Sequence, residues 1–73
     1  MIMQMTKTQK DEVLRDLEAR MARSGRSVDL SVARELAADG SSIDEIDMLM
    51  RGMFSRLTIE ALIAEAAELS QQK

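Results

Sequence analysis

The part of the chain that decides the fold is SIDEIDMLMRGMFSRLTIEALIAEAAEL, which runs from Ser42 to Leu69. It opens with the pattern of a capping box. In such a box the Ser42 hydroxyl accepts a hydrogen bond from the amide three residues on, while Glu45 reaches back to the Ser42 amide. This pattern predicts that a helix begins at Ile43.

The apolar side chains downstream of this start change direction within the same stretch. At about 100° of rotation per residue, those from Ile43 to Leu57 point one way and those from Ile59 to Leu69 point nearly the opposite way. We therefore expect a break near residues 52–58, with one helix over about 43–54 and another over about 58–70 that Thr58 caps. The alternative is one unbroken helix over 43–69, which would favour an intertwined dimer.

Two glycine-centred breaks, around Gly25 and Gly40, divide the rest of the chain. Each has the composition of a helix end followed by a new helix start. They predict a helix over about 10–23 and another over about 29–39. The second of these would be capped by Ser27 or Asp29.

Charges at the two ends of the predicted helix 10–23 suit the helix macrodipole. Asp11 and Glu12 would occupy its first turn, and Arg20 and Arg23 its last. Two acid–base pairs four residues apart, Asp11–Arg15 and Asp16–Arg20, would add support along its surface.

The chain has 73 residues, no Pro and many strong helix formers. This predicts an all-α bundle of three to four short helices in a single domain spanning 1–73, with residues 1–8 as a flexible N-terminus. A chain this short builds only a modest core. We therefore also expect a homodimer to complete it.

The inventory of reactive side chains is poor, since the sequence contains neither Cys nor His and its lysines lie only near the two ends. General acid–base or nucleophilic chemistry would fall to carboxylates and hydroxyls alone. The sequence thus predicts a non-enzymatic protein without metal or cofactor. Its apolar stretches are too short to span a membrane and lack the order of a signal peptide, so we expect a cytoplasmic protein.

Methionines crowd beside the single aromatic residue, Phe54. Thioethers adapt their shape, and such surfaces recur on proteins that bind the helices of other proteins. The alternative is that these residues fill the core of a protein short of large side chains. Our interpretation is a small regulatory, inhibitor or adaptor protein that binds another protein. Its candidate partner-binding residues are Met48, Met50, Met53, Phe54, Ile59 and Ile63.

The segment Gly40-Ser41-Ser42-Ile43-Asp44-Glu45-Ile46 has the arrangement G-x-S-x-x-E-I, and Ser55-Arg56-Leu57-Thr58-Ile59 has the arrangement S-x-x-T-I. Over about residues 36–62 the chain thus loosely resembles a LuxR-type helix-turn-helix, whose recognition helix opens with S-x-x-T-V. Ser55 stands two residues too late after Glu45 for that pattern. The resemblance implies a tri-helical packing of residues 28–69 and, as the alternative function, a DNA-binding transcriptional regulator.

The charge of the chain disfavours nucleic acid as a partner. Its formal net charge is −3, and residues 41–73 carry the whole excess of acid. Phosphate backbones require Lys and Arg. The candidate contacts for a nucleic acid or an acidic partner are Arg20, Arg23, Arg26 and Arg56. Gathering of these four on one face would favour DNA binding, whereas their dispersal, with Glu60 and Glu65 exposed, would count against it.

Overall fold

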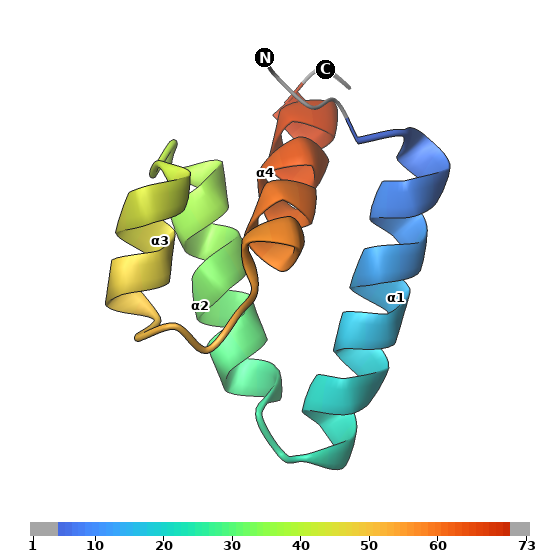
Figure 1. Ribbon diagram of the computed structural model, residues 1–73, viewed down its shortest axis with the longest axis vertical. Coiled ribbons are helices and arrows are strands. Elements are labelled where there is room, and N and C mark those ends of the chain that lie inside the picture. Colours follow the sequence, from blue (N-terminus) through green and yellow to red (C-terminus); the bar gives the residue numbers. More distant parts are fainter. Residues whose placement is uncertain (1–4, 71–73) are drawn as a thin grey trace.

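Four α-helices make up the computed structural model, which describes residues 5–70. They are α1 (Lys7–Arg23), α2 (Ser27–Ala38), α3 (Ile43–Leu49) and α4 (Arg56–Ser70). The described residues contain no strand, so the expected all-α bundle of short helices is confirmed. In Figure 1, α1 and α3 lie on opposite sides of the bundle, and α2 and α4 stand between them.

Helix α1 begins earlier than predicted because Thr6 caps it. The Thr6 hydroxyl accepts from the Gln9 amide at 3.1 Å, and the Gln9 side chain accepts from the Thr6 amide at 3.1 Å. This capping box places Lys7 and Thr8 in the first turn, inside the segment 1–8 that was expected to be flexible. Residues 1–4 of that segment lie outside the described residues.

Because α1 begins earlier than predicted, one prediction about the charges at its ends was wrong. Its first turn holds no acidic residue, so the placement of Asp11 and Glu12 there was wrong. The basic last turn, with Arg20 and Arg23, is confirmed. Of the two predicted pairs, Arg20 lies 3.1 Å from Asp16, whereas Asp11 lies 3.1 Å from Lys10.

The ends of α1 and α2 share one motif. The chain leaves each of these helices through a glycine with positive φ, which is Gly25 at 72° after α1 and Gly40 at 87° after α2. The amide after each glycine bonds back to a carbonyl five residues earlier, from Arg26 to Met21 at 2.8 Å and from Ser41 to Leu36 at 3.1 Å. This is the Schellman arrangement, which satisfies the last carbonyls of a helix.

The chain re-enters a helix directly after Gly25, so α2 begins at Ser27 and not near Asp29. The residue before the helix is Arg26, whose side chain makes no capping hydrogen bond. The prediction that Ser27 or Asp29 caps this helix was therefore wrong.

The capping box at the start of α3 is confirmed, since Ser42 Oγ accepts from the Glu45 amide at 3.1 Å and Glu45 Oε1 accepts from the Ser42 amide at 2.9 Å. However, α3 ends at Leu49, five residues before the predicted end. Arg51 and Gly52 follow with φ of 55° and 70°, which turns the chain away from the helix. The predicted break is thus real, and the unbroken helix over 43–69 is excluded.

Helix α4 begins two residues earlier than predicted, and a different residue caps it. The Ser55 hydroxyl accepts from the Thr58 amide at 3.2 Å and lies 3.0 Å from the Thr58 hydroxyl. Thr58 was expected to be the cap, but it lies inside the helix and is buried. The cap therefore comes from the serine three residues before it.

The core gathers side chains from all four helices, and its largest fully buried members are Leu17, Ile46, Ile59 and Leu62. Helix α4 packs against each of the other three. Because the chain breaks between α3 and α4, the two apolar faces that would oppose each other on a straight helix meet in one core. A single chain therefore buries both faces.

Two groups of ion pairs join the helices across the bundle. The Arg34 guanidinium of α2 lies 2.8 Å from Glu18 of α1 and 3.1 Å from Glu65 of α4. The Lys10 ammonium, at the start of α1, donates to Glu68 near the end of α4 at 2.7 Å. These contacts fix α4 between its neighbours in the arrangement that Figure 1 shows.

Candidate functional site

The structure divides the six predicted partner-binding residues between core and surface. Met50, Phe54 and Ile59 are buried, and Ile63 is half-buried against the core. Phe54 and Ile59 are thus not available to a partner in this fold, and Met50 is exposed only at the edge of the core, with 8% of its surface accessible. They act as core filler, which was the alternative considered for the methionines and Phe54. Met48 and Met53 remain on the surface, 69% and 37% exposed.

Two further apolar side chains of the same segment are exposed, and neither was among the predicted partner-binding residues. Leu49 is 54% exposed and Leu57 is 49% exposed. Both flank the α3–α4 connection, since α3 ends at Leu49 and α4 begins at Arg56. Together with the two exposed methionines they form what we call the 48–57 surface, which consists of Met48, Leu49, Met53 and Leu57.

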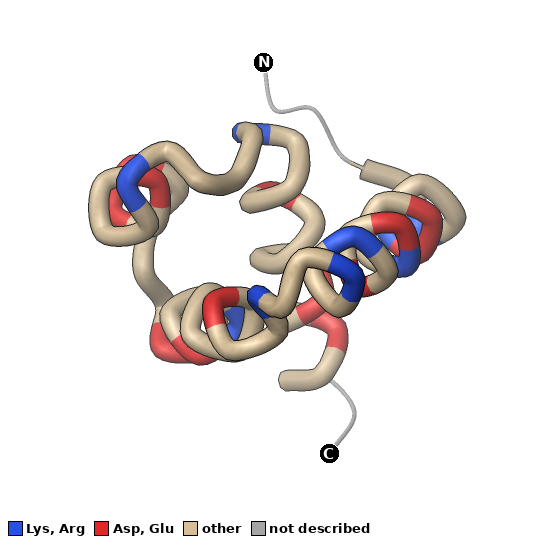
Figure 2. Tube along the Cα trace, turned by 90° about the horizontal axis from the view of Figure 1, so that it is seen from below, with Lys and Arg blue, Asp and Glu red and all other residues tan. Residues whose placement is uncertain are grey.

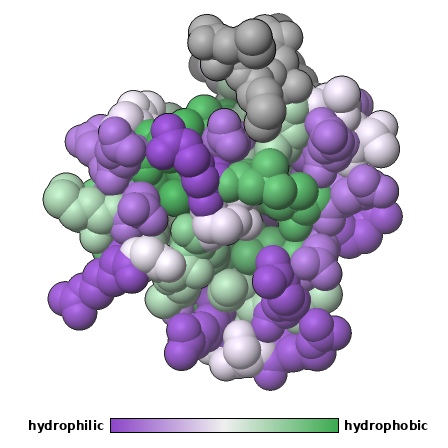
Figure 3. Space-filling view, in the orientation of Figure 1, coloured by the Kyte–Doolittle hydropathy of each residue, from purple (hydrophilic) through white to green (hydrophobic). Residues whose placement is uncertain are grey.

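Other exposed apolar side chains lie elsewhere, with Val28 and Val32 on α2 and Leu69 at the end of α4. On the face of the molecule that Figure 3 shows, hydrophobic residues reach the surface in several patches, and hydrophilic residues separate these patches. The 48–57 surface differs from the others because four large apolar residues occur there within ten positions. Monomeric domains rarely expose large apolar clusters unless these bind something.

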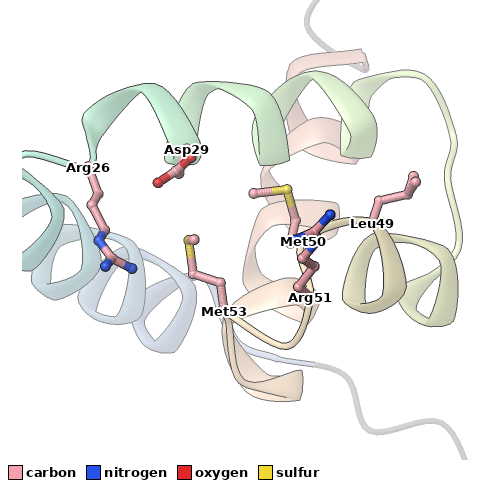
Figure 4. Close-up of a pocket in the computed structure, with 6 residues that line it drawn as sticks. All are labelled: Arg26, Asp29, Leu49, Met50, Arg51 and Met53. Atoms are coloured by element: carbon pink, nitrogen blue, oxygen red, sulfur yellow. The ribbon is translucent and has the colours of Figure 1, made fainter.

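A hollow lies beside the 48–57 surface, between the start of α2 and the α3–α4 connection. It measures about 430 Å³ and is lined by Arg26, Asp29, Leu49, Met50, Arg51 and Met53. In Figure 4, Arg26 and Asp29 descend from the start of α2, while Met50 and Met53 rise toward them from the connection. We call this the α2–α3 hollow. Its lining combines three apolar side chains, those of Leu49, Met50 and Met53, with three charged ones, and Arg26 and Arg51 are the two basic residues among them.

The four arginines predicted as alternative contacts do not form one group. Arg20 is paired with Asp16 on its own helix, and Arg56 lies 3.9 Å from Asp44. Arg23 is exposed at the end of α1, and only Arg26 lines the hollow. Figure 2 shows Lys and Arg as separate stretches that alternate with Asp and Glu along the trace. Arg51, which is not one of these four predicted contacts, is the second basic residue at the hollow.

The position of α4 bears on the helix-turn-helix resemblance. A recognition helix must present an exposed face to the major groove. Here α4 is the central helix, with Thr58, Ile59, Ala61 and Leu62 buried. Glu60 and Glu65 are only half-buried, and Glu65 faces Arg34. Six residues, 50–55, separate α3 from α4, whereas a helix-turn-helix turn has about three or four.

Nowhere between residues 5 and 70 do three or more His, Cys, Asp or Glu side chains gather in a way that could hold a metal ion. No helix in that range is both long and apolar enough to cross a bilayer. What the surface does offer is four exposed apolar side chains within ten positions, two of which, Leu49 and Met53, line a hollow together with Arg26 and Arg51.

Comparison with known proteins adds no further assignment. No family model, no curated protein and no solved structure matches this chain.

Proposed function

We propose that this protein is a small non-enzymatic regulator, inhibitor or adaptor that binds another protein through the 48–57 surface. The observation that carries the proposal is the exposure of Met48, Leu49, Met53 and Leu57 at the junction of α3 and α4. Burying such side chains against a partner contributes about 25 cal/mol for each Å² of apolar surface removed from water. Methionine side chains adapt to the shape of what they meet, which suits a binding surface.

The rest of the molecule supports the same proposal. The largest core side chains, which come from α1, α3 and α4, are fully buried within one chain. The residues of the 48–57 surface lie outside this buried core and are free to contact a partner. A second copy of this chain is one partner that could cover them, and the experiment below separates this case.

A pair of matched double variants tests the proposal. Met48→Glu with Leu57→Glu places two charges on the 48–57 surface. Val28→Glu with Leu69→Glu places two charges elsewhere, on positions that are 75% and 62% exposed, against 69% and 49% for Met48 and Leu57. The tagged wild-type chain and both variants would be used to capture proteins from a host lysate, with and without nuclease treatment. Captured proteins would be identified by mass spectrometry.

We expect the wild type and the Val28/Leu69 variant to retain the same protein, and the Met48/Leu57 variant to lose it. Sedimentation of the purified chain shows whether the partner is a second copy. Equal capture by both variants would refute the proposal. Capture that disappears after nuclease treatment would instead favour the alternative function, DNA binding through a helix-turn-helix.

A further inference from the structure

We infer that the α2–α3 hollow binds an acidic amphipathic peptide segment of the partner protein. This inference rests on the proposed function and specifies its partner. An apolar side chain of the segment would enter among Leu49, Met50 and Met53. Carboxylates beside that side chain would pair with Arg26 and Arg51 at the rim.

The lining of the hollow suits an apolar anchor. This is an open hollow of about 430 Å³, and three of its six lining residues, Leu49, Met50 and Met53, are apolar. Two of its six lining residues are methionines, whose unbranched side chains repack around different shapes. Leu49 extends the lining into the 48–57 surface, so an anchor in the hollow continues onto the exposed apolar cluster.

The charges at the rim favour a partner with carboxylates. Within residues 5–70, neither Arg26 nor Arg51 has a carboxylate within 4.0 Å. Asp29 is the one acidic residue of the lining, and it stands in the first turn of α2, where the helix macrodipole already stabilises a negative charge. Two guanidinium groups thus remain for a ligand, and each can hold a carboxylate by two parallel hydrogen bonds.

The backbone at Arg51 provides an independent argument. Arg51 has a φ of 55°, the left-handed conformation that disfavours side chains with a Cβ atom. Its position corresponds to that of Gly25 and Gly40 at the ends of α1 and α2, where glycine avoids this cost. An arginine held in such a conformation at the rim of a hollow is the kind of outlier that points to a binding role.

The test begins with a selection of random peptides displayed on phage against the immobilised full-length chain. Enriched peptides would be synthesised and titrated against the wild type by fluorescence anisotropy. Arg51→Gly and Arg26→Gln each remove one guanidinium from the rim, and Arg51→Gly does so while relaxing the backbone. Arg15→Gln is the matched control, because it removes the same charge from an exposed position on α1 outside the hollow.

We expect the selection to enrich peptides that carry Asp or Glu next to a large apolar residue. Each rim variant should weaken their binding by about tenfold, since hydrogen bonds to charged groups are lost, while Arg15→Gln should leave it within about twofold. Raising the salt concentration from about 50 mM to about 500 mM should also weaken binding. Circular dichroism would confirm that each variant keeps its helix content.

Three outcomes would overturn the inference. They are no enrichment at all, enrichment of peptides without carboxylates, or equal binding to the wild type and to Arg51→Gly. A duplex DNA oligonucleotide that binds the wild type and not Arg51→Gly, in place of acidic peptides, would assign the rim to nucleic acid. If lysate capture still depends on Met48 and Leu57 in these cases, the proposed function stands and only the peptide assignment fails.

Discussion

At the scale of one residue, Arg51 takes the left-handed position at the end of α3 that glycine takes at the ends of α1 and α2. At the end of α3, the Arg51 amide bonds to the Met48 carbonyl at 3.1 Å and the Gly52 amide bonds to the Asp47 carbonyl at 3.0 Å. These two bonds place Arg51 at the left-handed position, and Gly52 follows one residue later. A left-handed conformation costs a residue with a Cβ atom about 1–2 kcal/mol. The chain tolerates this cost, and the guanidinium reaches the α2–α3 hollow.

The substitution Arg51→Gly should therefore raise the free energy of unfolding. Glycine relieves the left-handed strain but gains freedom in the unfolded chain, so we expect a net increase of about 0.5–1 kcal/mol. Urea unfolding followed by circular dichroism measures it, which suits a chain without Trp or Tyr.

Gly40→Ala provides the opposite control. A Cβ atom there would meet nothing within 4 Å, so only the backbone conformation, with φ of 87°, opposes the alanine. We expect a loss of about 1 kcal/mol. A decrease in stability for Arg51→Gly would show that the arginine side chain contributes more to the fold than its backbone costs.

At the scale of the element, the start of α4 depends on a single serine. The Ser55 hydroxyl accepts from the Thr58 amide, one of the amides that a helix start leaves unsatisfied. The substitution Ser55→Ala should destabilise the protein by about 1 kcal/mol. Ser27→Ala is the control, since Ser27 opens α2 without capping it, and should change stability by less than about 0.5 kcal/mol. Equal effects in urea unfolding would mean that the Ser55 hydroxyl does not anchor α4.

The helices themselves could be predicted because several of their boundaries depend on hydrogen bonds and backbone conformations of residues close in sequence. The Ser42–Glu45 box and the two glycines at 25 and 40 act through hydrogen bonds within a few residues, and each marked a real boundary. The end of α3 could not be placed from its glycine alone. The Schellman register put Arg51 in the left-handed position and left Gly52 one residue beyond it.

The candidate site was harder to predict, because exposure depends on where helices end. Helical phase grouped Leu49 and Leu57 in one direction with Ile46, yet Leu49 and Leu57 are exposed whereas Ile46 is buried, because α3 ends at Leu49. Conversely, Met50 and Phe54 are buried even though they lie outside any helix. Arg51 and Arg26 both line one hollow because α2 packs against α3, and no local sequence pattern predicts this packing.

At the scale of the whole molecule, Arg34 links three helices through its contacts with Glu18 and Glu65. Each partly exposed ion pair contributes about 0.2–1 kcal/mol, so Arg34→Met should destabilise the protein by about 1 kcal/mol. The control Arg20→Met removes a pair of the same 3.1 Å length with Asp16, but within one helix, and should cost about 0.3–0.5 kcal/mol.

A double-mutant cycle separates the ion pair from the packing of the arginine stem. In the background of Glu65→Gln, the cost of Arg34→Met should fall by at least about 0.5 kcal/mol, because groups in contact do not act additively. Strict additivity would mean that Arg34 supports the bundle only through its apolar stem.

The contact between Lys10 and Glu68 joins the start of α1 to the end of α4. It also makes the free energy of unfolding vary with pH in the alkaline range. The hydrogen bond to Glu68, with a smaller contribution from Asp11, raises the pKa of Lys10 above its ordinary value of 10.5, although burial opposes this. The folded state therefore holds the Lys10 proton more tightly than the unfolded state does. This stabilisation is fully present below pH 10.5 and is lost as the pH rises through the higher pKa of the folded state.

Few other groups obscure this dependence, because the chain contains no Tyr and no Cys and has only three lysines. We expect the stability of the wild type to fall above pH 10.5, and that of Lys10→Met to fall less steeply over the same range. Lys7→Met is the control, since Lys7 is exposed and has no ion pair among residues 5–70. It should keep the steep decline of the wild type. Parallel profiles for the wild type and Lys10→Met in urea unfolding would show that α1 and α4 are joined by their apolar contacts alone, without the ammonium group.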